Sequence, residues 1–181
     1  MAIVVGMSGR RGSGKSTLSW GVAEKLSWQR AGFGDYVRSE AKRIGLDDSL
    51  ETLQAVGEKL VMQGPETFCR AVLYQAGWES GTPLVIDGIR HAEIVEALRS
   101  IVAPAEFRLV HVSVEEAVRE SRLLARDKTG REESRQYDMH STERQVDSLS
   151  RLADLIVDGN LPEIQIINTI TRWVHHLASN C

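Results

Sequence analysis

The chain is predicted to fold as a single three-layer α/β/α sandwich around a mostly parallel five-stranded sheet. Short apolar runs alternate with longer segments of helical spacing, and a glycine-rich turn joins the first apolar run to the first helical segment. Alternation of this kind favours parallel strands with helices on both faces of the sheet. The length of 181 residues fits one domain of ordinary size.

The first half of the chain is expected to contain two strands and several helices. Residues 3–7 are apolar and partly β-branched, which is typical of a buried strand. Weaker apolar character predicts a second strand over 29–33. Helical spacing predicts helices over 15–26, 35–44 and 50–78. Within the last of these, Gly64 and Pro65 should break or kink the helix.

The second half is expected to supply three more strands. Compact apolar runs predict strands over 84–86, 107–112 and 155–157. Apolar residues at helical spacing predict helices over 92–102, 115–127, 141–152 and 161–177. Residues 128–140 are polar and almost devoid of aliphatic side chains, so we expect an exposed loop or a small lid there.

Composition and charge exclude several classes of protein. The 42% hydrophobic and 26% charged residues are close to a globular average, which argues against disorder. The net charge of −3 provides no positive field for nucleic acid or an anionic membrane. No apolar run approaches the roughly 18–20 residues that span a bilayer, and the N-terminus does not resemble a signal peptide. We therefore expect a cytoplasmic protein with no nucleic-acid or membrane partner.

Cysteine and tryptophan carry no functional pattern. Cys69 and Cys181 are too far apart in sequence to suggest a disulfide framework or a metal motif, and Cys69 is expected to be a small buried hydrophobe. Trp20 and Trp28 are expected to pack between helix and sheet, and Trp173 to cover the sheet from the last helix.

The glycine-rich turn matches the phosphate-binding pattern G-x-x-x-x-G-K-[ST]. It follows a predicted strand and opens a predicted helix, which is the context that the pattern requires. Its glycines allow backbone N–H groups to approach a phosphate, and the helix directs its positive dipole end at the same anion. Lys15 would contact the β- and γ-phosphates, and the Ser16 hydroxyl would bind Mg²⁺. The expected nucleotide-binding residues are Gly9, Arg10, Arg11, Gly12, Ser13, Gly14, Lys15, Ser16 and Thr17.

The motif predicts a P-loop NTPase fold that uses ATP and Mg²⁺. The rest of the chain narrows the class: it has no Asn/Thr-Lys-x-Asp element for guanine, no Leu-Ser-Gly-Gly-Gln element, and no Asp-Glu pair at residues 87–88. The chain is also short for a module of a ring ATPase. A small phosphotransferase fits these observations best.

Three segments together resemble the nucleoside monophosphate kinase family, of which adenylate kinase is the best-known member. The P-loop is the first. The sequence Gly-Asp-Tyr-Val-Arg at 34–38 is similar to the family's Thr-Gly-Asp-x-x-Arg, with Phe33 in the place of threonine. The sequence Leu-Val-Ile-Asp-Gly-Ile-Arg at 84–90 is similar to Asp-Gly-Phe-Pro-Arg, without the proline. Together with Ala-Asp-Leu-Ile-Val at 153–157, these segments resemble most an adenylate-kinase-like branch of the family that is related to dephospho-coenzyme A kinase.

The resemblance implies roles for residues on the acceptor side. Arg38 would hold the phosphate of the acceptor. Arg90 would face that phosphate or the γ-phosphate, or form a surface salt bridge instead. Asp87 would bind Mg²⁺ directly or through water, or cap the next turn. Asp35 shares a helix face with Arg38 and would orient or deprotonate the acceptor, or cap the helix.

The resemblance also implies residues that act on the transferred group. Arg122 and Arg126, one helical turn apart, would be lid-entry arginines that close over the triphosphate; alternatively they form a solvated face. Lys15, Arg90, Arg122 and Arg126 would thus neutralise transition-state charge.

We therefore expect an ATP-dependent small-molecule kinase that transfers the γ-phosphoryl group to a nucleoside monophosphate or similar nucleotide. The core would span about 1–33, 80–127 and 141–181, with an acceptor-binding helical segment at about 34–79 and a lid at about 128–140. Dephospho-coenzyme A kinase is one alternative, and an NTP-binding switch or regulatory ATPase is another. The protein is expected to be a monomer or a small homo-oligomer.

Overall fold

The computed structural model describes residues 2–127 and 141–179, without the side chains of residues 126, 127 and 141–144. The expected lid at 128–140 lies outside the described residues. The strands are β1 (Ile3–Ser8), β2 (Gln29–Gly32), β3 (Leu84–Ile89), β4 (Glu106–Ser113) and β5 (Leu155–Asp158). The helices are α1 (Lys15–Leu26), α2 (Phe33–Arg43), α3 (Leu50–Gln63), α4 (Pro65–Gln75), α5 (Ala92–Ile101), α6 (Glu116–Asp127), α8 (Ser141–Ser148), the short 3₁₀ helix η1 (Leu149–Leu152) and α9 (Glu163–Ser179).

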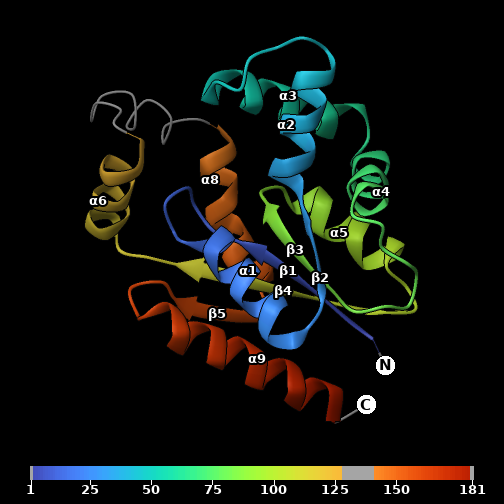
Figure 1. Cartoon of the computed structure of the whole chain (residues 1–181), viewed down its shortest axis with the longest axis vertical. Coiled ribbons are helices and arrows are strands. Elements are labelled where there is room, and N and C mark those ends of the chain that lie inside the picture. The colour runs from blue at the N-terminus through green and yellow to red at the C-terminus, as the bar shows by residue number, and fades with distance from the viewer. Residues whose placement is uncertain (1, 128–140, 180–181) are drawn as a thin grey trace.

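The described strands form one five-stranded sheet in the order β2-β3-β1-β4-β5 (Figure 1). Every neighbouring pair is parallel. The carboxyl ends of β1 and β3 therefore lie side by side at one edge of the sheet. Phosphate- and ligand-binding residues of open α/β sheets lie at such an edge. The predicted three-layer fold is confirmed.

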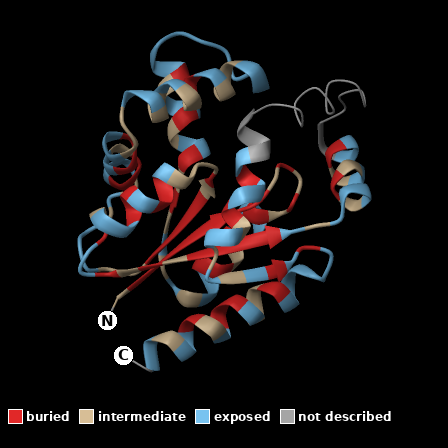
Figure 2. Cartoon of the chain, turned by 180° about the vertical axis from the view of Figure 1, so that it is seen from behind, coloured by how far each residue is buried: buried red, intermediate tan, exposed pale blue. Residues whose placement is uncertain are grey.

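Two apolar clusters cover the two faces of the sheet. On one face Ile3, Val5 and Met7 of β1 pack with residues of α1 and α9. On the other face Val4 packs with residues of α4 and α5, and this cluster continues into α2 and α3. The alternation along β1 follows from the two-residue period of a strand. Figure 2 shows the buried residues concentrated in the strands and on the helix sides that face them.

A close contact at Gly6 of β1 leads to the first prediction. A Cβ atom there would lie 2.5 Å from Phe107 Cζ and 2.6 Å from Ile89 Cδ1, both in the buried core. We expect Gly6→Ala to lower the free energy of unfolding by about 1–3 kcal/mol, because the core is already filled. Urea denaturation measures the change. Gly57→Ala, inside α3, is the matched control, because the nearest atom to its Cβ would be 3.7 Å away. This variant should be as stable as the wild type or more stable, since alanine is preferred to glycine in a helix interior by up to about 1 kcal/mol. Equal effects of the two variants would contradict the prediction.

The segment between β2 and β3 forms a group of three helices, α2, α3 and α4, beside the sheet. The helical stretch that begins at residue 50 ends at Gln63 and resumes at Pro65, so the predicted break is confirmed. Helix α2 packs against both α3 and α4, and Figure 1 shows α2 and α3 beyond the end of β3. This arrangement places the predicted acceptor-binding segment next to the end of β3.

Several details differ from the sequence prediction. Phe33, predicted as the last residue of a strand, is the first residue of α2. Strand β3 continues past Asp87 to Ile89, with Gly88 at a φ of 85°. Trp20 was expected to be packed, but 62% of it is exposed, because it lies on the solvent side of α1. Trp28 and Trp173 do pack against the core, and Cys69 is fully buried. Burial raises the pKa of the Cys69 thiol to about 12, which fits an unreactive core residue.

Within the described part of the chain, no helix combines the length and the apolar character that crossing a membrane would need.

Candidate active site

The loop between β1 and α1 has the geometry of an anion cradle. Gly12 and Gly14 have φ values of 84° and 88°, a region that side chains with a Cβ rarely adopt. Helix α1 begins at Lys15 without a side-chain cap. The first N–H groups of α1 are therefore directed towards the loop, where they can bind a phosphate.

A cavity of about 330 Å³, which we call the main cavity, lies beside this loop. The P-loop, α2, α3 and the end of β3 all contribute to its wall. Besides the P-loop residues Arg11, Gly12, Gly14 and Thr17, five residues predicted from sequence line it: Lys15, Ser16, Arg38, Asp87 and Arg90. These five residues come from positions up to 75 apart along the chain, so the fold itself assembles the site.

Asp87 has the properties of a cation ligand. It is 5% exposed and lines the cavity. Its Oδ2 atom accepts a hydrogen bond from Arg30 Nη2 at 2.8 Å, whereas Oδ1 is buried and has no hydrogen-bond partner among the described residues. A buried carboxylate oxygen without a partner is costly, and a hard cation such as Mg²⁺ would satisfy it.

The residues present fit Mg²⁺ bound together with a nucleotide. Asp87 and the Ser16 hydroxyl line the same cavity and offer oxygen ligands. In the described ranges no cluster of three or more His, Cys, Asp or Glu side chains could hold a metal ion. Mg²⁺ is usually held by one or two protein oxygens, with substrate phosphates and water completing its shell.

Asp35 lies beside the cavity without lining it. Helix α2 starts at Phe33 and receives no side-chain cap, so the helix-cap alternative for Asp35 is wrong. Its carboxylate instead accepts from Arg30 Nη1 at 2.8 Å and lies 3.6 Å from Arg38 Nη1. Asp35 therefore contacts arginines on both sides.

Apolar side chains form the far wall of the main cavity. Phe33 and Phe68 meet edge to face with ring centroids 5.0 Å apart. The other apolar residues of this wall are Val37, Leu50, Leu53, Val61, Ile89 and Ile94. Two polar residues of α3, Gln54 and Glu58, also line the cavity. Such a wall suits a flat, largely apolar group with a few polar atoms at its edge.

His91 lies at the junction between the cavity and α8. It lines the cavity and forms a hydrogen bond with Gln145. Burial is the largest influence on its imidazole and lowers its pKa below the ordinary value. His91 is therefore neutral at pH 7. The predictions from sequence did not include it, although it directly follows Arg90.

A second cavity, of about 280 Å³, lies on the other side of the P-loop. Gly12, Gly14 and Thr17 line both cavities. Arg122 lines the second cavity and donates from Nη2 to the Gly159 carbonyl at 2.9 Å and from Nη1 to the Ser13 carbonyl at 3.3 Å. The side chain of Arg126, predicted to act with Arg122, lies outside the described residues.

Two further arginines brace the P-loop. Arg10, expected to contact nucleotide, pairs with Asp147 of α8 at 2.6 Å and with Glu116 of α6 at 3.3 Å. Arg119, which the sequence analysis missed, is fully buried; it pairs with Glu116 and donates to the Arg11 carbonyl at 3.2 Å. Arg119 lies four residues before the buried Leu123 on one helix face, and that spacing was the available signal.

Comparison with known proteins assigns the chain to a family. Residues 5–145 match a family model described as an AAA domain. A UPF0200 protein of Methanothrix thermoacetophila is 32% identical over 127 residues, which cover 70% of this chain and 67% of the relative.

The chain therefore belongs to the family of the AAA domain model and to the UPF0200 family.

Solved structures share the fold of this UPF0200 family member. A shikimate kinase from Acinetobacter baumannii in complex with shikimate superposes with a TM-score of 0.59 at 15% identity, over 97% of this chain and 94% of that one. A gluconokinase from Sinorhizobium meliloti gives a TM-score of 0.55 at 18% identity, over 99% and 94%. At such identities the likeness shows that the fold is that of P-loop kinases.

Proposed function

We propose that this UPF0200 family member is an ATP- and Mg²⁺-dependent phosphotransferase that acts on a nucleoside monophosphate or a similar nucleotide. The observation that carries the proposal is that two cavities meet at one P-loop, with Lys15 and Asp87 in the larger one. An enzyme that only hydrolyses ATP needs room for water beside the γ-phosphate, whereas a kinase needs room for a second substrate.

The second cavity suits the nucleoside part of the donor. Arg122 and the backbone at Gly159 provide polar contacts, while Leu18, Leu161 and Ile166 provide an apolar surface for a base. A triphosphate would extend from there across Gly12 and Gly14 towards Lys15. Mg²⁺, held by Ser16 and Asp87, would neutralise phosphate charge. The loop amides and Lys15 would hold the β- and γ-phosphates in place.

The main cavity suits a nucleotide acceptor better than a small polyol. Its wall of aliphatic and aromatic side chains would surround a planar base, and Gln54 and Glu58 offer hydrogen bonds to the edge of that base. Arg38 and Arg90, which line the same cavity, would hold the phosphate of the acceptor, since a guanidinium pairs with two phosphate oxygens. The segment around 34–79 would then be the acceptor-binding part of the domain, with a lid at 128–140.

A panel of acceptors tests the proposal. The protein is incubated with Mg·ATP and, separately, nucleoside monophosphates, dephospho-coenzyme A, shikimate or gluconate, and the products are separated by chromatography. We expect ADP and a nucleoside diphosphate with at least one monophosphate. Phosphorylated dephospho-coenzyme A or polyol would reassign the acceptor. ADP release at one unchanging rate with every acceptor would indicate the alternative, an NTP-binding switch or regulatory ATPase.

Arg38 provides a residue-level prediction within this panel. Arg38→Gln should raise the KM for the phosphorylated acceptor about tenfold, the loss of roughly one charge-assisted hydrogen bond. The KM for ATP should stay unchanged, because Arg38 lines the main cavity and not the second cavity, where the nucleoside part of ATP would bind. Arg43→Gln is the control, since Arg43 lies on the same helix but its side chain is exposed and pairs with the neighbouring Glu40. A change in both KM values for Arg38→Gln would contradict the assignment.

A further inference from the structure

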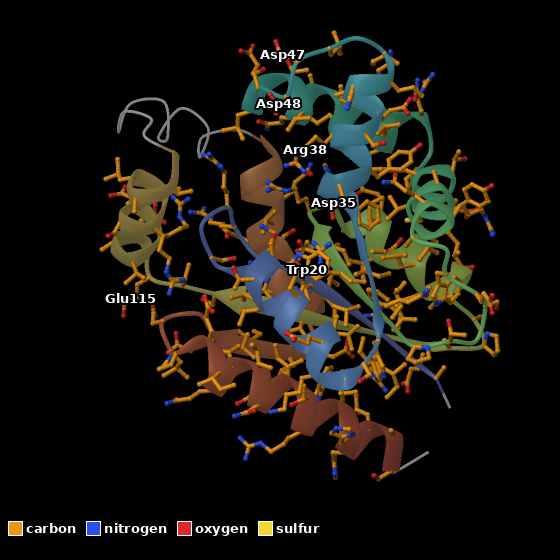
Figure 3. The ribbon with its side chains drawn as sticks, viewed as in Figure 1. Trp20, Asp35, Arg38, Asp47, Asp48 and Glu115 are labelled. Atoms are coloured by element: carbon orange, nitrogen blue, oxygen red, sulfur yellow. The ribbon has the colours of Figure 1, made fainter. Side chains whose placement is uncertain are left out.

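Arg30 of β2 belongs to no motif, yet its guanidinium joins the two halves of the candidate active site. Nη2 donates to Asp87 Oδ2 and Nη1 donates to Asp35 Oδ2, both at 2.8 Å. Its side chain is 8% exposed. The guanidinium also lies 4.5 Å from the ring centroid of Trp20, which covers it from the α1 side. Figure 3 places Trp20 on α1, below Asp35 at the start of α2, with Arg38 one turn further along.

The local backbone is built to accommodate these contacts. In the parallel register of β2 and β3, Arg30 is opposite Val85 and Gly32 is opposite Asp87. A Cβ atom at Gly32 would lie 2.9 Å from Asp35 Cγ and 3.3 Å from Arg30 Nη1. Any larger residue at position 32 would therefore push the Asp35 carboxylate away from Arg30.

A third contact connects Arg30 to the first turn of α1. Its Nε donates to Ser19 Oγ at 2.8 Å, and Ser19 Oγ in turn donates to the Ser16 carbonyl at 2.8 Å. Arg30 therefore touches one candidate magnesium ligand directly and reaches the backbone of the other through a single side chain. Ser19 is fully buried, so this connection is shielded from water.

We propose that Arg30 is a positioning residue: its guanidinium holds Asp87 by one oxygen, so that the other oxygen stays available for Mg²⁺, and through Asp35 it orients the acceptor-side Arg38. The carboxylate geometry supports this, because Oδ2 of Asp87 is engaged and Oδ1 is buried in the wall of the cavity without a partner among the described residues. The proposal rests on the proposed function, since it assigns Asp87 and Arg38 to the two substrates.

Shape distinguishes this role from simple neutralisation of a buried carboxylate. A lysine at position 30 would supply the same charge, but its single ammonium group cannot reproduce the planar fork that reaches Asp87, Asp35 and Ser19 together. If Arg30 only balanced charge, Arg30→Lys would behave as the wild type. If it positions Asp87, Arg30→Lys should weaken Mg²⁺-dependent nucleotide binding, as Arg30→Gln should.

The experiment measures Mg²⁺-dependent nucleotide binding by calorimetry, with ADP and no acceptor. The quantity of interest is the ratio of ADP affinities with and without Mg²⁺. For Arg30→Gln and Arg30→Lys we expect this ratio to fall about tenfold, the usual size for loss of a residue that orients a metal ligand. ADP affinity without Mg²⁺ should stay within twofold of the wild type. Arg43→Gln, an exposed arginine of α2, is the matched control and should change neither value.

The Asp35 arm is tested separately by steady-state kinetics. Asp35→Asn should raise the KM for the phosphorylated acceptor and leave the Mg²⁺ ratio unchanged, whereas Arg30→Gln should change both. Thermal unfolding of each protein without ligand establishes that the variants are folded.

Each outcome has a defined meaning. An unchanged Mg²⁺ ratio in folded Arg30→Gln overturns the proposal, because Arg30 then does not position Asp87. An increased ratio also overturns it, because it would mean that the guanidinium competes with Mg²⁺ for Asp87. A wild-type value in Arg30→Lys overturns it as well. A wild-type protein that binds ADP equally with and without Mg²⁺ would instead contradict the proposed function.

Discussion

Lys15→Ala is expected to lower kcat for phosphoryl transfer by about 10²–10³-fold, the usual cost of removing one preorganised group that stabilises transition-state charge. Lys15 is 7% exposed and lines the main cavity at the start of α1. Its ammonium group is therefore held close to where the β- and γ-phosphates would lie. Initial rates with ATP and the best acceptor measure the change.

Two further measurements separate lost catalysis from lost folding. Without ligand, the melting temperature of Lys15→Ala should remain close to that of the wild type. With Mg·ATP at about 100 times its Kd, the wild type should gain roughly 2.7 kcal/mol of stability, and the variant much less. Lys25→Ala is the control, since Lys25 lies on the same helix but is exposed and contacts Asn168 of α9. Undiminished turnover by Lys15→Ala would refute the assignment of the P-loop as the donor site.

Arg119→Ala is expected to have the largest effect on stability, a loss of about 3 kcal/mol in the free energy of unfolding. Arg119 is fully buried, so truncation leaves a cavity beneath the P-loop. It also removes the donor to the Arg11 carbonyl and one of the two cationic partners of Glu116. Affinity for Mg·ATP should fall as well, because the loop loses a brace on its backbone. Chemical denaturation and calorimetry measure the two effects.

A second substitution separates the cavity from the hydrogen bonds. Arg119→Met keeps most of the side-chain volume and should cost about 1–3 kcal/mol through the lost hydrogen bonds alone. Arg172→Ala is the control, because Arg172 donates to the Asn168 carbonyl from an exposed position on α9. It should change stability by less than about 0.5 kcal/mol. A stability of Arg119→Met equal to the wild type would show that the guanidinium does not brace the loop.

These two predictions differ in how far sequence could have led to them. Lys15 could be predicted because strand, loop and helix follow one another within 17 residues, and the chemistry of the loop depends on local backbone geometry. For Arg119, the spacing from Leu123 indicated at most a buried helix face. Its contact with the P-loop could not be predicted, because its partner Arg11 lies 108 residues away in sequence. An arginine among other charged residues of α6 is more often exposed than buried.

The helical boundaries show the same distinction. Gly64 and Pro65 ended one helix and began the next as predicted, since both residues act on their own backbone. The prediction that Trp20 is packed was wrong, because helical periodicity does not specify which side of α1 meets the sheet when both sides carry large side chains. Asp35 looked like a cap from its place near a helix start, but a charge from the neighbouring strand engages it instead.

The amino-acid order alone predicted the layered fold from periodicity and the phosphate-binding loop with Ser16 from a short contiguous pattern. The candidates Arg38, Asp87 and Arg90 followed from a family resemblance in short segments of the chain. The joining of these candidates into one cavity, and the role of Arg30 between Asp87 and Asp35, emerged only from the folded chain. Parallel pairing places Gly32 opposite Asp87, 55 positions further along the chain. Contacts of this kind depend on the packing of whole elements, which no local pattern encodes.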